Sequence, residues 1–191
     1  MPRLLDALLG KPHTCPWWFC YTFDNPVRRL VHDPAVILAE LVGPGDTVVD
    51  AGCGMGFFSL GLARLVGPGG RVLAIDLQEE MLRRAARRAR RRRLADQIEF
   101  RRCTPDRLGL AETVDFVLAF WMAHEVGNQE SFFTEIEGAL RPGGHLLIAE
   151  PFGHVTAARF ERTLEVACAA GLDVAPGPHV LFSRSAVCTR T

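Results

Sequence analysis

Short apolar runs alternate with longer amphipathic segments over most of the chain, from position 47 onward. Runs rich in β-branched and aromatic residues predict strands, at 47–52, 71–76, 97–102, 114–120, 145–151 and 179–190. Between them, apolar positions recur three or four residues apart, which predicts helices, at 57–67, 77–95, 128–140 and 155–170. Strands that alternate with helices form a parallel sheet with helices on both faces, so we expect a Rossmann-like α/β fold.

The first 42 residues lack this alternation, and we interpret them as a cap or lid on a domain that spans 43–191. Pro34 divides the apolar positions that follow residue 26 into two short predicted helices. Ahead of them, the stretch "PWWFCYTF" at 16–23 concentrates aromatic side chains. These side chains either wall an apolar pocket and exclude water from it, or they only attach the segment to the domain. Within this stretch, Tyr21 is a candidate catalytic residue.

The charge balance changes this picture little. The 191 residues include 22 basic and 22 acidic ones, for a formal net charge of zero, so no global field attracts nucleic acid or an anionic membrane. No signal peptide is predicted, and no apolar run approaches the roughly 20 residues that a membrane-spanning helix needs. The 6 cysteines are scattered along the chain, which is typical of a reducing compartment. We therefore expect a cytoplasmic protein without a membrane partner.

The stretch "DAGCGMGFF" at 50–58 joins the first predicted strand to the first helix. Its three alternate glycines permit positive φ and let a ligand approach the backbone, and the amide groups of the following helix favour an anion. A triphosphate-binding loop would carry a lysine, and a dinucleotide-binding loop would carry a glycine where this chain has Phe57. A smaller zwitterion fits better, with its carboxylate on the helix amides and its ammonium near Asp50.

Asp76 ends the second predicted strand, about 20 residues after the glycine loop, where folds of this kind place an acid on ribose hydroxyls. A carboxylate that accepts two hydroxyl protons forms charge-assisted hydrogen bonds of about 1.5–3 kcal/mol each. The alternative is that Asp76 caps the following helix. The glycine loop at this distance favours ribose binding.

Four motifs, "VVDAGCGMG", "AIDLQEEML", "VDFVLAFWMAHEV" and "LRPGGHLLIAEP", follow one another along the chain. In this order and spacing the chain resembles the class I S-adenosylmethionine-dependent methyltransferases, over residues 45–190. The resemblance implies a seven-stranded sheet whose last strand is antiparallel, S-adenosylmethionine as the cofactor, and methyl transfer as the reaction.

The resemblance also implies which residues hold the cofactor. Those that would line its methionine part are Asp50, Gly52, Cys53, Gly54 and Gly56. Those that would contact its ribose, adenine and sulfonium are, in that order, Asp76, then Leu77 and Met81, then Ala119, Phe120 and Trp121.

One stretch departs from the family pattern. After the third strand the family places an acid that binds the adenine amino group, whereas this chain has "RRCTPDRL" at 101–108. Thr104 or Pro105 occupies the matching position, where a hydroxyl or a main-chain carbonyl would replace the acid. The alternative is Asp106, an acid shifted along the chain.

His124 follows the fourth predicted strand and lies at the mouth of the expected site. A neutral imidazole there takes a proton from a hydroxyl, thiol or amine, so His124 is a candidate catalytic residue; the alternative is that it only holds the loop. Glu125 either orients His124 or caps the next helix, and His154 reaches the same rim. Motifs for a flipped base, a cytosine-directed cysteine and a catechol-type magnesium site are missing. Without a large inserted domain, we expect a small, partly apolar methyl acceptor.

Two rival functions stay open. The arginine-rich run at 83–93 would suit an RNA or protein methyltransferase that docks on this helix. Its alanines fall with Leu82 on one predicted buried stripe, so we interpret the arginines as a solvated face and disfavour a nucleic-acid partner. The other rival is a regulator that binds the cofactor without turnover. Cys15 and Cys20 lack zinc-knuckle spacing, so no metal is expected, and the sequence leaves the oligomeric state open.

Overall fold

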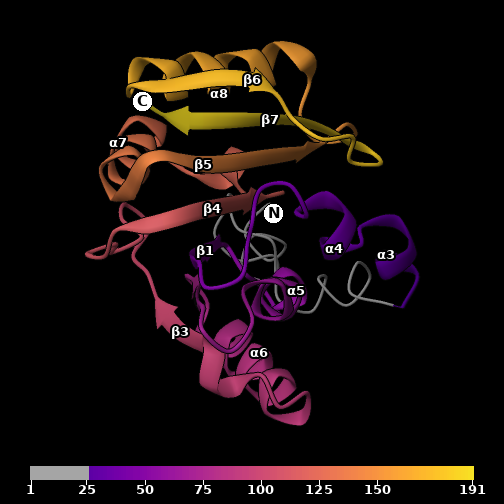
Figure 1. The fold of residues 1–191 in the computed structure, drawn as a ribbon. Helices are drawn as coiled ribbons and strands as arrows, with labels where there is room; N and C mark the ends of the chain where they lie inside the picture. The colour runs from indigo at the N-terminus through magenta and orange to yellow at the C-terminus, as the bar shows by residue number, and fades with distance from the viewer. Residues whose placement is uncertain (1–25) are drawn as a thin grey trace, which may run out of the picture.

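A seven-stranded sheet forms the centre of the protein in the computed structural model, which describes residues 26–191 (Figure 1). The strands are β1 (Thr47–Ala51), β2 (Arg71–Asp76), β3 (Ile98–Arg102), β4 (Val114–Phe120), β5 (Leu140–Pro151), β6 (Leu172–Pro176) and β7 (Ser183–Arg190). They lie in the order β3-β2-β1-β4-β5-β7-β6. β7 is antiparallel to both neighbours, and the other strand pairs are parallel. The expected α/β fold with an antiparallel last strand is confirmed.

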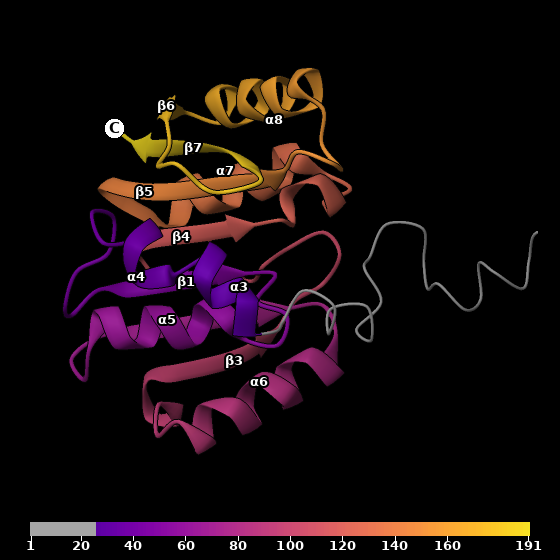
Figure 2. The same ribbon diagram turned by 90° about the vertical axis from the view of Figure 1, so that its right-hand side faces the viewer.

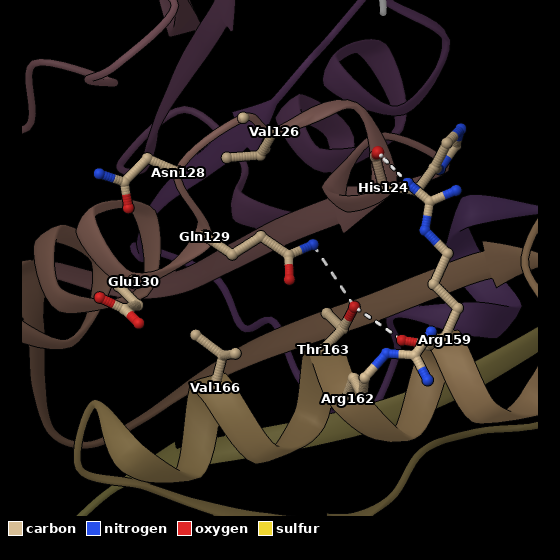
Figure 3. A pocket seen from close by; sticks show the side chains of 10 residues that line it. His124, Val126, Asn128, Gln129, Glu130, Arg159, Arg162, Thr163 and Val166 are labelled. Atoms are coloured by element: carbon tan, nitrogen blue, oxygen red, sulfur yellow. Dashed lines mark hydrogen bonds between the residues drawn. The ribbon is translucent and has the colours of Figure 1, made fainter.

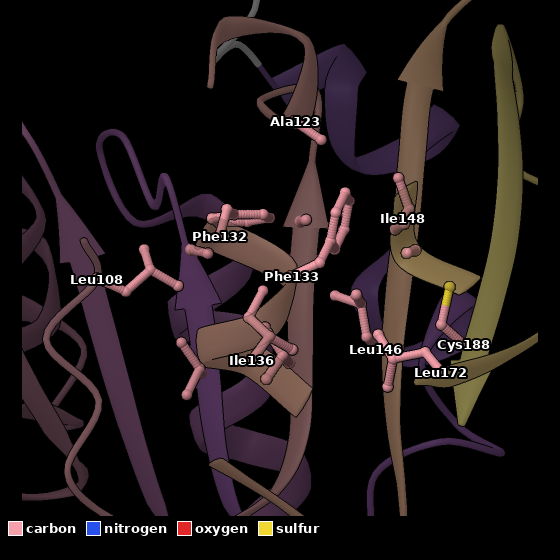
Figure 4. Packing of buried hydrophobic residues seen from close by; sticks show 14 of the residues in the cluster. Leu108, Ala123, Phe132, Phe133, Ile136, Leu146, Ile148, Leu172 and Cys188 are labelled. Atoms are coloured by element: carbon pink, nitrogen blue, oxygen red, sulfur yellow. The ribbon is translucent and has the colours of Figure 1, made fainter. Parts of the chain in front are cut away.

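Helices cover both faces of this sheet. One face carries α4 (Pro34–Ile37), α5 (Phe57–Val66) and α6 (Glu79–Arg91), and the other carries α7 (Gln129–Ala139) and α8 (Ala157–Ala169). Successive strand residues point to opposite faces, so Val48 packs with α5 while Val49 packs with the α7 side. Figure 2 shows α4 and α5 in front of the strands and α7 behind them. Figure 4 shows Phe133 of α7 beside Ile148 of β5, in the core between the sheet and α7 and α8.

The structure differs from the predicted elements in three places. The hydrophobic pattern misses β6, because Leu172 is its only buried residue and the strand lies at the edge of the sheet. The arginine-rich helix ends at Arg91, since Arg93 has a left-handed φ of 57° that a helix cannot continue. β5 begins at Leu140 rather than 145, with a register shift opposite β4.

Between residue 26 and β1 lie two short helices, as the position of Pro34 predicts: α3 (Pro26–Val31) and α4. Pro34 occupies the first turn of α4, and the Asp33 carboxylate accepts a hydrogen bond from the Ala35 amide at 3.0 Å. The aromatic stretch at 16–23, which includes Tyr21, lies outside the described residues together with Cys15 and Cys20. The lid therefore stays a prediction. No helix within residues 26–191 is long and apolar enough to cross a membrane.

Gly61 lets α5 pack closely on α4. A Cβ at Gly61 would lie 2.4 Å from the Cβ of Pro34, and the proline ring is too stiff to yield. We expect Gly61→Ala to lower the free energy of unfolding by about 1–3 kcal/mol, although alanine is the better helix former. Urea denaturation measures this change.

Gly138 of α7 is the matched control. A Cβ there would meet nothing within 4 Å, so Gly138→Ala should be neutral or should raise the free energy of unfolding by up to about 1 kcal/mol. If both variants responded alike, the close contact between α4 and α5 would not explain the glycine at position 61.

Candidate functional site

The glycine loop lies at the carboxyl ends of the central strands. The register pairs Ala51 of β1 with Ile75 of β2 and with Ala119 of β4. The next residue in each chain segment is Gly52, Asp76 or Phe120, so the predicted residues from three segments meet at one edge of the sheet. This edge is where ligands bind in open α/β sheets.

Open space borders the backbone at the middle of this loop. Gly54 has a φ of 53°, and a Cβ built on it would meet nothing within 4 Å. Gly52 has a φ of 69°, and a Cβ there would lie 2.9 Å from the Cβ of Met122. Both φ values favour glycine. Only Gly54 leaves room for a ligand to approach the main chain.

Asp76 is held rigidly beside this loop. One carboxylate oxygen accepts a hydrogen bond from the Gly54 amide at 2.9 Å, and the other accepts one from the Gln78 amide at 2.8 Å. Burial raises the pKa of Asp76, and the backbone amides partly offset that rise. The N-cap of α6 is Gln78, so the alternative in which Asp76 is the helix cap is wrong. Each oxygen keeps a lone pair for a further donor.

Asp50 is more deeply buried than Asp76, with 3% of its surface exposed. The Ser59 hydroxyl donates a hydrogen bond to it at 2.5 Å. Burial raises the pKa of Asp50 to about 7, and the nearby negative charge of Asp76 adds to this rise. The site thus contains two buried acids, and the positive charge of Arg28 partly offsets the rise in the pKa of Asp50.

The residues predicted to contact adenine differ in their burial. Met81 is buried on α6, and Leu77 is half-buried ahead of it. The Cys103 amide donates to the Asp76 carbonyl at 3.1 Å, which brings the segment after β3 to the site. Thr104 and Pro105 are exposed on a tight turn, where the Thr104 amide donates to the Arg107 carbonyl at 3.1 Å.

The segment after β4 and the N-terminal helices meet at the same edge. The Arg28 guanidinium of α3 lies over the Phe57 ring at 4.5 Å and over the Trp121 ring at 5.6 Å. The His32 ring contacts the Trp121 ring edge-on at 5.1 Å. Trp121 also donates a hydrogen bond from Nε1 to the Ser183 hydroxyl at 2.8 Å. Sequence reasoning missed Arg28 and His32, because no motif marks either residue.

His124 is oriented by a buried carboxylate, that of Glu150. Glu150 is the penultimate residue of β5 and has 1% of its surface exposed. One of its oxygens lies 2.5 Å from His124 Nδ1, and the other accepts from the His124 amide at 3.1 Å. Sequence reasoning considered Glu125 for this role and missed Glu150, although an acid in the apolar run "HLLIAEP" is a detectable signal.

A groove of about 640 Å³ opens beside His124, between the start of α7 and one side of α8 (Figure 3). Its lining residues are His124, Val126, Gly127, Asn128, Gln129, Glu130, Arg159, Arg162, Thr163 and Val166. The His154 ring lies 5.3 Å from the His124 ring, but His154 is not among the lining residues of the groove.

The arginine-rich helix packs much as its pattern predicts. Leu82, Ala85 and Ala89 are buried against the body, while Ala86 is half-buried. Arg84 pairs with Glu80 at 2.7 Å, an i, i+4 ion pair of the kind that helix surfaces often carry.

Residues 26–191 contain no group of three or more His, Cys, Asp or Glu side chains arranged to hold a metal.

The strand order, the glycine loop after β1 and the acid at the end of β2 define a Rossmann-like methyltransferase fold. The chain belongs to the methyltransferase domain family, whose model matches residues 43–174. The resemblance to class I S-adenosylmethionine-dependent methyltransferases is thereby confirmed.

The similar proteins differ in size and in named function. A structure described as a SAM-dependent methyltransferase from Aquifex aeolicus is 25% identical, with a TM-score of 0.83 over 93% of this chain and 100% of that one. The arsenite methyltransferase of Halobacterium salinarum is 32% identical over 57% of this chain and 28% of its own length. The ubiquinone/menaquinone biosynthesis C-methyltransferase UbiE of Klebsiella pneumoniae is 29% identical over 56% and 43%. The chain thus spans less than half the length of these two curated relatives.

Proposed function

We propose that this chain transfers a methyl group from S-adenosylmethionine to a small, partly apolar acceptor. The observation that carries the proposal is the Asp76 carboxylate, fixed by the Gly54 and Gln78 amides beside open backbone. Ribose hydroxyls would donate to the remaining lone pairs of this carboxylate. The curated relatives named for arsenite and quinone methylation support a small acceptor.

The residues at this edge fit the cofactor. The buried Asp50 carboxylate would hold the ammonium of the methionine part, and the open backbone at Gly54 leaves room for that part. Cys53, Gly56 and Ala119 would complete the methionine and sulfonium contacts. Phe57 and Trp121 already hold a cation, the Arg28 guanidinium, which shows that this wall tolerates positive charge.

Bound S-adenosylmethionine supplies an electrophilic methyl group on a good leaving group. The chain has to align the acceptor, exclude water and receive a proton where the acceptor carries one. The Glu150 carboxylate accepts from His124 Nδ1–H, which leaves the Nε2 lone pair to take the proton of a hydroxyl, thiol or amine. Glu150 is thus a positioning residue, and His124 is the proposed base. We propose that the N-terminal segment caps the site and that Tyr21 in this segment is a second catalytic residue.

Titration calorimetry with S-adenosylmethionine and S-adenosylhomocysteine tests cofactor binding directly. Transfer of a labelled methyl group to a panel that contains phenols, thiols, arsenite and a demethylated quinol then tests turnover. Failure of both compounds to bind would remove the proposal. Binding without transfer to any acceptor, in the panel or in short RNA, would favour the regulator over the enzyme.

Cofactor affinity should depend on pH through Asp50. Its pKa of about 7 means that the carboxyl is protonated below neutral pH in the free protein, whereas the ammonium binds the carboxylate. Binding therefore releases a proton, and affinity should fall as the pH drops below 7, by up to about tenfold per unit. Calorimetry in two buffers of different ionisation enthalpy counts the protons released.

Asp50→Asn is the control for this pH dependence. The variant should bind more weakly at neutral pH and should lose most of the change between about pH 6 and pH 7. If the unaltered protein released no proton in this range, Asp50 would not be the ammonium partner.

A further inference from the structure

The groove between α7 and α8 carries uneven charge. Arg159 and Arg162 lie one turn apart on α8, and Glu130 is the one carboxylate among the residues that line the groove. Figure 3 places both arginine side chains at the end near His124 and Glu130 at the opposite end. The end beside the proposed base is therefore positive.

Both guanidinium groups keep donors that no acid neutralises. Across residues 26–191 the Arg162 side chain makes no ion pair or hydrogen bond, and the Arg159 side chain donates only to the His124 carbonyl, at 2.7 Å. A guanidinium carries five N–H donors. Most of the donors at this end of the groove remain available to a ligand.

Two other polar side chains of the groove already have partners. Gln129 Nε2 donates to the Ala123 carbonyl at 2.8 Å, and the Thr163 hydroxyl donates to the Arg159 carbonyl at 3.2 Å. Val126 and Val166 supply apolar contact. An occupant of the groove would thus meet two arginine side chains at one end, with apolar contact from the two valine side chains.

We infer that this groove binds an anionic group of the methyl acceptor, a carboxylate or a phosphate, and so selects acidic acceptors with an apolar part. The inference rests on the proposed function. Planar guanidinium groups match two oxygens of either anion. The hydrogen bond from Arg159 to the His124 carbonyl links the anion site to the loop that carries the proposed base. An acceptor anchored here lies beside His124.

Two probes test the inference: benzoate and inorganic phosphate, each titrated at low salt into the full ¹⁵N-labelled chain. Arginine side-chain N–H signals report binding, and the probe that binds tells carboxylate from phosphate. Arg162→Ala should weaken probe binding about tenfold. The affinity of Arg162→Lys should lie between those of Arg162→Ala and the unaltered protein, because an ammonium keeps the charge but lacks the planar fork of donors. Arg91→Ala is the matched control, since Arg91 is exposed on α6 near β3, and it should change nothing.

Several results would overturn the inference. One is that neither benzoate nor phosphate binds. Another is that Arg91→Ala weakens binding of a probe as much as Arg162→Ala does. A third is that a short RNA binds in an Arg162-dependent way while neither probe binds. S-adenosylhomocysteine, titrated into the same samples, separates the two proposals. If it binds while benzoate and phosphate do not, only the anion site is wrong. If it does not bind, the proposed function is wrong.

Discussion

Asp76→Ala is expected to weaken the binding of S-adenosylmethionine by about a hundredfold or more. The carboxylate would accept two ribose hydroxyls, in charge-assisted hydrogen bonds of about 1.5–3 kcal/mol each. The substitution also frees the Gly54 and Gln78 amides, so the glycine loop loses a support. Titration calorimetry of the purified variant measures the change in affinity.

Asp115 offers a matched control for this substitution. Its carboxylate accepts from the Thr47 amide at 2.8 Å at the start of β1, the opposite end of the strand from Gly52. Asp115→Ala should therefore lose a comparable structural hydrogen bond and keep its affinity for the cofactor. Asp76→Asn keeps one acceptor oxygen and should bind with intermediate affinity. Equal affinities in Asp76→Ala and the unaltered protein would contradict the ribose assignment.

Glu150→Ala is expected to lower the free energy of unfolding by roughly 3–5 kcal/mol, because it leaves buried donors without their charged acceptor. Both carboxylate oxygens serve His124, one at its amide and one at Nδ1. The freed imidazole should also lose its fixed tautomer, and methyl transfer to any acceptor that must lose a proton should slow. Urea denaturation measures the first effect, and ¹⁵N chemical shifts of the His124 ring measure the second.

Glu137 is the control for the loss of a carboxylate. It pairs with Arg190 at 3.0 Å, and about a quarter of each side chain is exposed, 27% and 28%. Glu137→Ala should cost less than about 1 kcal/mol, as exposed ion pairs do. Glu150→Gln keeps the side-chain volume and separates the loss of charge from the loss of packing. A Glu150→Ala variant as stable as Glu137→Ala would rule out the proposed support of His124.

The alternation of apolar runs was enough to predict the sheet and most of its helices. β1, β2 and β4 are buried strands with β-branched residues, so their period is strong. The edge strand β6 was not predicted, because Val174 and its neighbours face solvent and show no alternation of buried and exposed positions. The end of α6 was not predicted either, since arginine rarely adopts the left-handed φ that Arg93 has just after this helix.

By itself, the sequence determined the fold class, the glycine loop and the acid of β2, because each depends on residue types and their spacing within short stretches of the chain. Only the tertiary structure decided which carboxylate orients His124 and that Arg28 lies over Phe57. It also decided that α7 and α8 enclose a groove. Contacts of this kind join segments far apart in the chain. They depend on strand order, register and helix packing, which no local pattern records.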